Sequence, residues 1–123
     1  ALHETALRLL PDLKHKFFLV TKAVRLENAP YDVHRHFDLR KGDVVFLLPG
    51  GIRPVKDNSF AVAPLDQLVR DHPDIRLAFV GPELDPAYAE ACKKSVAGKS
   101  WVRHLPQVPH ECMLEVYRRA LGR

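Results

Sequence analysis

VVFLL, residues 44–48, is an unbroken apolar run between the turn-forming residues GD at 42–43 and PGG at 49–51. A short apolar run between turn residues is typical of a strand that is buried on both faces, as strands are in a parallel sheet. We therefore expect residues 44–48 to form the central strand of a parallel sheet.

Strands and helices alternate in the sequence after this run. The patterns predict a helix capped by Asn58 or Ser59, a strand over Ile75–Val80, a helix over Pro86–Val96, a strand over Trp101–Leu105 and a helix over His110–Leu121. Such alternation indicates βαβ units with right-handed connections. The predicted fold class is α/β, with a Rossmann-like open parallel sheet.

The residues before the apolar run predict a different organisation. Leu2–Leu10 has a helical apolar stripe that Pro11 ends, Lys16–Val24 has the composition of a strand, and Glu27–Lys41 indicates a long loop. We expect residues 1–41 to be an N-terminal crossover segment, and residues 42–123 to be a partial Rossmann-like domain.

Composition excludes several classes of protein. With 123 residues, 46% hydrophobic and 28% charged, the chain resembles one globular domain, which excludes global disorder. No apolar run approaches the roughly 20 residues that a membrane span needs. The net charge is +4, but the charges form no long run, so we expect no nucleic-acid partner.

Cysteine usage and the N-terminus point to a cytoplasmic protein. Cys92 and Cys112 form no CxxC pair, so we expect two reduced thiols in the core. The N-terminus shows no basic and apolar leader of a secretory signal. It also lacks an initiator Met, so we expect either a fragment or a processed form of a longer chain.

The loop PGGIRPVKD, residues 49–57, is the most informative stretch for function. Gly50 and Gly51 let a backbone approach a ligand closely, and the helix that follows offers free N–H groups. Arg53 and Lys56 add two cations, and together these features suit a phosphate. The loop is neither GxxxxGK[ST] nor GxGxxG. A glycine turn flanked by solvated cations is the alternative.

Other chemical groups give weaker signals. His34 and His36 lack a third nearby ligand, and neither His-Glu pair completes HExxH, so we expect no metal. Glu83 and Asp85 follow a predicted strand, where they would contact a ligand hydroxyl. Alternatively they form a turn in which Asp85 caps the next helix.

Three segments together resemble a known family. They are GIRPVKD at 51–57, VGPELDP at 80–86 and VRHLPQV at 102–108. The pattern resembles the C-terminal, donor-binding domain of the GT-B group 1 retaining glycosyltransferases, and the first two segments recur in one vertebrate branch of that family. The resemblance covers most of the chain.

The resemblance implies a nucleotide-diphosphate-sugar donor, transfer with retention, and neither a metal nor another cofactor. Lys56 matches the lysine that grips the diphosphate, and Arg53 is the nearest arginine, displaced by two places from the family position that Gly51 occupies here. These two residues are the implied catalytic pair, since they would stabilise the departing diphosphate. The full set of implied donor contacts is Gly50, Gly51, Arg53, Lys56, Gly81, Glu83, Arg103 and Leu105.

The family also has parts that this sequence lacks. Its E-x7-E segment would follow Leu121, and its N-terminal acceptor domain is absent, so we expect the chain to be inactive alone. Truncation would uncover apolar faces near Phe79, Trp101 and Leu121, which predicts a homo-oligomer. The alternative function is a non-catalytic Rossmann-like module that binds phosphate, a phosphosugar or a protein partner.

Overall fold

The computed structural model describes residues 2–16 and 29–121. The helices are α1 (Leu2–Leu9), α2 (Val33–His36), α3 (Val62–Asp71), α4 (Pro86–Val96) and α5 (Met113–Ala120), and the strands are β1 (Val44–Pro49), β2 (Ile75–Val80) and β3 (Val102–Leu105). Short 3-10 helices occupy Pro11–Lys16, Pro54–Lys56, Asn58–Ala61 and His110–Cys112. The strand predicted over Lys16–Val24 lies, beyond its first residue, outside the described residues.

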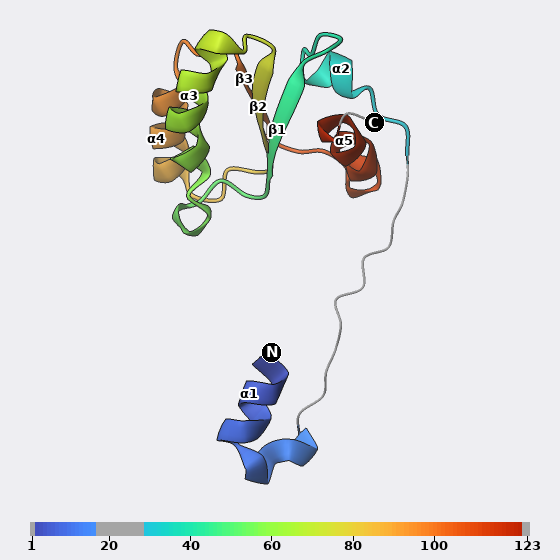
Figure 1. Ribbon diagram of the computed structural model, residues 1–123, viewed down its shortest axis with the longest axis vertical. Coiled ribbons are helices and arrows are strands. Elements are labelled where there is room, and N and C mark those ends of the chain that lie inside the picture. The colour runs from blue at the N-terminus through green and yellow to red at the C-terminus, as the bar shows by residue number, and fades with distance from the viewer. Residues whose placement is uncertain (1, 17–28, 122–123) are drawn as a thin grey trace.

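The three strands form one parallel sheet in the order β1-β2-β3 (Figure 1). Val44 pairs with Ile75, and Leu77 pairs with Val102. This arrangement confirms the predicted α/β class with an open, all-parallel, Rossmann-like sheet.

The expectation that residues 44–48 form the central strand is wrong for the described sheet. β2 is central, and β1 is an edge strand in which Val44 and Phe46 are 48% and 43% exposed. The physical reason is that α3, which follows β1, packs on β2 and leaves this part of β1 uncovered. An apolar run predicts burial but does not say which strand the helices cover.

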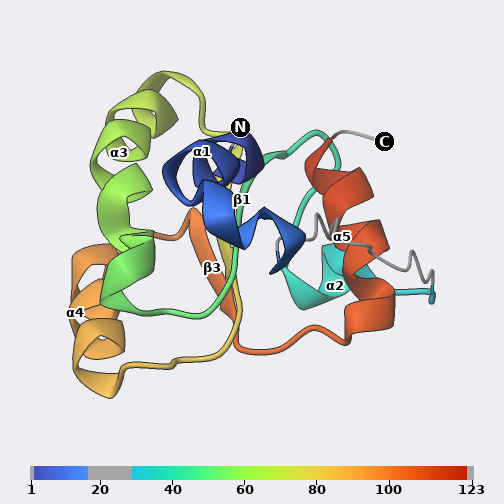
Figure 2. The ribbon, with the colours of Figure 1, turned by 90° about the horizontal axis from the view of Figure 1, so that it is seen from below.

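Helices cover both faces of the sheet. Figure 2 shows α3 and α4 on one side of the strands and α2 and α5 on the other. Leu77 and Phe79 of β2 belong to the first core cluster, while Ala78 and Val80 belong to the second. The alternation of side chains along a strand therefore supplies both layers of the core from β2 alone.

Only one of the three apolar residues that the sequence predicts to be exposed is exposed in the structure. Trp101 and Phe79 are only 7% and 4% exposed, so both are core residues, whereas Leu121 is 71% exposed as expected. The exposed apolar side chains instead include Val44 and Phe46 on β1. Assembly into a homo-oligomer stays a prediction.

Two prolines lie where the backbone tolerates them. The N–H groups of Val44 and Gly50 donate toward β2, so the intervening odd-numbered residues of β1 present theirs to the open edge. Pro49 takes such an outward position, where its missing N–H breaks no ladder bond. Pro64 lies in the first turn of α3, because the helix begins only at Val62, after a 3-10 turn.

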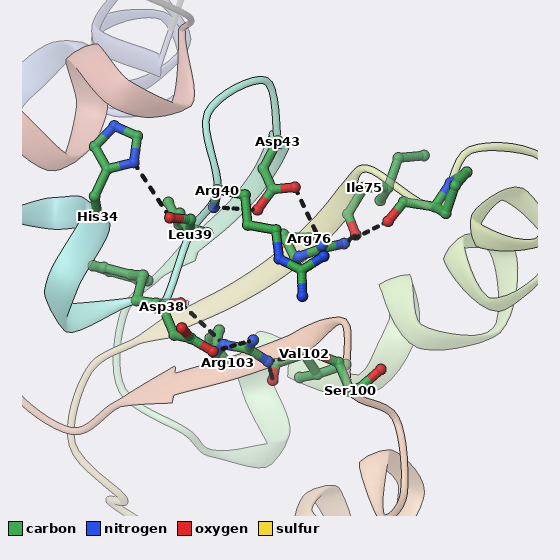
Figure 3. A network of polar contacts seen from close by, with 12 residues as sticks. His34, Asp38, Leu39, Arg40, Asp43, Ile75, Arg76, Ser100, Val102 and Arg103 are labelled. Carbon is green, nitrogen blue, oxygen red and sulfur yellow. Dashed lines mark hydrogen bonds and ion pairs between the residues drawn. The ribbon is translucent and has the colours of Figure 1, made fainter.

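Polar contacts tie the amino ends of the strands to the chain before β1 (Figure 3). The buried carboxylate of Asp43 accepts the Arg40 N–H at 2.7 Å and pairs with the Arg76 guanidinium at 3.2 Å. Arg76 also donates to the carbonyls of Pro73 and Ile75, each at 2.7 Å. The buried charge of Asp43 is thereby paired, as burial requires.

No helix within residues 2–16 and 29–121 combines the length and the apolarity that a membrane crossing requires.

Leu77→Ala should destabilise the fold more than a matched change on the surface. Leu77 is fully buried on β2, so truncation should lower the free energy of unfolding by about 2–5 kcal/mol. The control Leu68→Ala, on a side chain that is 45% exposed, should cost about 1 kcal/mol or less. Urea denaturation measures both, and equal losses would contradict the placement of β2 at the centre.

Candidate functional site

The loops after β1 and β2 lie side by side at the carboxyl edge of the sheet. Ile52 and Glu83 form a parallel bridge beyond the strands. The Ile52 N–H donates to the Pro82 carbonyl at 2.8 Å, and the Ile52 carbonyl accepts the Leu84 N–H at 3.1 Å. The two predicted donor-binding loops are therefore joined by backbone hydrogen bonds.

Glycine makes this close approach of the loops feasible. A Cβ on Gly81 would overlap the carbonyl oxygen of Gly50, and Gly81 has φ +153°. Gly50 has φ +135°, also in the region that favours glycine, and nothing lies within 4 Å of the position where its Cβ would stand. A Cβ on Gly51 would overlap the side chain of Leu84. Gly51 and Gly81 thus allow the two loops to pack closely, whereas the Cβ position of Gly50 is open.

Arg53 and Lys56 project from the same short turn. The Lys56 N–H donates to the Arg53 carbonyl at 3.0 Å, and Asp57 then ends the turn in the left-handed conformation, with φ 42°. The Arg53 N–H donates to the buried side chain of Asn58 at 3.2 Å. Both cationic side chains are exposed, and neither has an ion-pair partner among the described residues. The turn therefore presents two unpaired cations to solvent.

The Glu83 carboxylate already has a cationic partner. The Lys93 ammonium lies 2.8 Å from it, and that hydrogen bond is the main cause that lowers the pKa of Glu83 below its ordinary value. His104 Nδ1 lies 3.8 Å from the same carboxylate, while its Nε2 is 3.1 Å from the Gly81 carbonyl oxygen. Glu83 thus lies at the loop edge as predicted, with a lysine and a histidine beside it.

Sequence reasoning missed both partners of Glu83. Lys93 follows it by ten residues and lies on α4, and His104 comes from β3. The period of two along β3 could have indicated that His104 shares a face with Val102, but no local pattern pairs either side chain with Glu83.

Arg103 does not join the loop cations. Its guanidinium donates to the Phe37 carbonyl and to the Asp38 carboxylate, each at 3.0 Å, and to the Ser100 carbonyl (Figure 3). These partners hold Arg103 against the chain before β1. Leu105, the last residue of β3, accepts the Gly81 N–H at 2.9 Å through its carbonyl and so lies at the loop edge.

Hydrogen bonds show the structural roles of Asp85 and His36. Asp85 caps α4, because its carboxylate accepts the Tyr88 N–H at 2.8 Å. His36 stacks on Tyr31, and its Nδ1 lies 2.8 Å from the Asp32 carbonyl oxygen. Within the described ranges, no three His, Cys, Asp or Glu side chains are grouped so that they could hold a metal ion.

Comparison with models of known protein families gives no match to this sequence. A functional proposal therefore rests on the sequence and the geometry of the loops after β1 and β2.

Gly81→Ala should destabilise the chain more than the same change at Gly98. Gly98 has φ +75° with nothing near its Cβ position, so alanine there should cost only the backbone strain of about 1 kcal/mol. At Gly81 the added carbon also meets the Gly50 carbonyl, which must shift. Thermal unfolding measures both variants, and an equal fall in Tm would contradict the close approach of the loops.

Lys93→Ala should raise the pKa of Glu83 toward its ordinary value of 4.5, because the main hydrogen bond that lowers it is lost. A lowered pKa in the folded state stabilises the protein above the unfolded pKa, and this stabilisation disappears as pH falls through the folded pKa. Carboxyl NMR titration measures the shift. The same Glu83 pKa in both proteins would show that Lys93 is not its partner in solution.

Proposed function

We propose that this chain is the nucleotide-sugar-binding part of a glycosyltransferase that transfers sugar from a nucleotide-diphosphate donor with retention. It would be inactive without the parts of the enzyme that hold the acceptor and the donor sugar. The observation that carries the proposal is the turn after β1, which presents Arg53 and Lys56 unpaired at the carboxyl edge of a parallel sheet.

The chemistry of a diphosphate suits this turn. Ligands of open parallel α/β sheets bind outside the carboxyl ends of the strands. Gly50 leaves open space beside the backbone, and the exposed side chains of Arg53 and Lys56 supply charge-assisted donors in the same loop. As the bond to the sugar breaks, negative charge develops on the leaving diphosphate. Two cations held at that position would stabilise it without a metal.

A second function is favoured by two of the contacts. Glu83 is paired with Lys93, and Arg103 is held by Asp38 and by carbonyl groups, so two of the expected donor contacts are already occupied. A non-catalytic Rossmann-like module would need only the cations of the loop. Such a module would bind phosphate, a phosphosugar or an anionic partner, and inorganic phosphate would compete with UDP on equal terms.

Lys56→Ala should abolish measurable binding of UDP or GDP, and Arg53→Ala should weaken it severely. Binding by this part alone should be near millimolar, about −4 kcal/mol. Loss of one charge-assisted contact of roughly 1.5–3 kcal/mol weakens binding by about tenfold to a hundredfold. NMR titration of amide shifts measures the affinity and locates the site at residues 50–57.

Lys94→Ala is the matched control, because Lys94 is an exposed lysine of α4. Lys99 is unsuitable, since its ammonium lies 2.6 Å from the Asp66 carboxylate. If Lys56→Ala binds nucleotide as the unmodified chain does, or if nucleotide shifts Lys94 as much as residues 50–57, the assigned site is wrong. Equal affinity for inorganic phosphate and UDP would favour the non-catalytic module.

A further inference from the structure

A pocket lies between α4 and the sheet, on the face that carries the first core cluster. Its volume is about 120 Å³. Six apolar residues line it, namely Ile52, Phe79, Ala89, Cys92, Val96 and Val102. They come from the loop after β1 and from β2, α4 and β3, so four separate parts of the fold build the apolar wall.

The charged side chains that line the pocket already have partners. Lys93 pairs with Glu83 at 2.8 Å. Lys99 pairs with Asp66 at 2.6 Å, and Arg103 pairs with Asp38 at 3.0 Å. The Nε2 of His104, which also lines the pocket, lies 3.1 Å from the Gly81 carbonyl oxygen. A charged ligand would therefore lose its hydration without gaining an unpaired lysine, arginine or glutamate among the described lining residues.

We propose that this pocket is a binding site for a small, uncharged apolar molecule, such as a six-membered aromatic ring or a branched hydrocarbon of similar size. An apolar protein cavity of about 150 Å³ is known to stay dry and to bind benzene. The pocket here is close to that size but is partly open to solvent, and Glu83, Lys93, Lys99, Arg103 and His104 line it beside the six apolar residues.

Water is a poor occupant of the apolar part of this pocket. Because the pocket is partly open, water can enter it, but a water held against the apolar part lacks the two to four polar partners that an ordered water needs. The Cys92 thiol is a weak hydrogen-bonding group, and the other five apolar side chains offer none. A ligand that fills the space restores the dispersion contacts that an unfilled cavity lacks. It also displaces poorly ordered water, which favours binding.

The pocket is separate from the loop cations. Arg53 and Lys56 do not line it, although Ile52 of the phosphate loop and two of the expected donor contacts, Glu83 and Arg103, do. The inference does not depend on the proposed function, because nucleotide binding should shift residues 50–57, whereas an apolar ligand should shift Ala89 and Val96 of α4.

Benzene added to the whole chain is the first probe. Nuclear Overhauser effects should connect benzene to the methyl groups of Ala89, Val96 and Val102, and Tm should rise with benzene concentration. Benzoate and benzylammonium, which have the same ring and opposite charges, should give neither signal. Absence of benzene contacts at these three methyls, or binding of a charged analogue as tight as that of benzene, would overturn the proposal.

Ala89→Leu tests the volume of the pocket, since Ala89 is 1% exposed and lines it. The added carbons should occupy the space and weaken benzene binding tenfold or more. Ala91→Leu is the matched control on the exposed side of the same helix, and it should bind benzene as the unmodified chain does. Equal benzene binding by Ala89→Leu and Ala91→Leu would overturn the proposal.

Cys92→Leu provides a second way to fill the pocket, because the Cys92 side chain lies in the same wall. Circular dichroism establishes that each variant folds before affinity is compared. If neither Ala89→Leu nor Cys92→Leu folds, the Overhauser contacts between benzene and the unmodified chain still test the proposal: their presence supports it and their absence overturns it.

Discussion

Burial of β2 on both faces and at both edges is the constraint on which the rest of the fold depends. Its side chains Leu77 and Ala78 have no exposed surface, and they point into opposite core clusters. A strand of this kind needs a hydrogen-bonded neighbour on each edge and helices on each face. β1 and β3 supply the neighbours, α3 and α4 cover one face, and α2 and α5 cover the other (Figure 2).

The position of the loops follows from the same constraint. β1 and β2 are parallel neighbours, so their carboxyl ends, and the loops after them, share one edge of the sheet. Gly81 then lets the second loop approach the first without a clash, and the Ile52–Glu83 bridge joins them. Arg53 and Lys56 are thereby carried on a turn that the second loop supports, as the proposed anion site requires.

Three cationic side chains are held by ion pairs within the fold, and one of them, Arg103, was an expected donor contact. Arg76 pairs with the buried Asp43, Arg103 reaches back to Asp38, and Lys99 pairs with Asp66. Each pair joins segments that are far apart in the sequence, so each connects elements of the fold. Arg53 and Lys56 have no such partner among the described residues, and they lie together in the loop at the carboxyl edge of the sheet.

The sequence alone determined the α/β class, the strand boundaries near Ile75–Val80 and the helix that begins at Pro86, because local apolar patterns and turn residues define them. It also located the glycine loop with its two cations. Only tertiary structure decided that β2 rather than β1 is central, because coverage by helices depends on the path of the chain in space. The ion partners of Glu83 and Arg103, and the pocket beside α4, likewise depend on contacts between distant segments, which no local pattern contains.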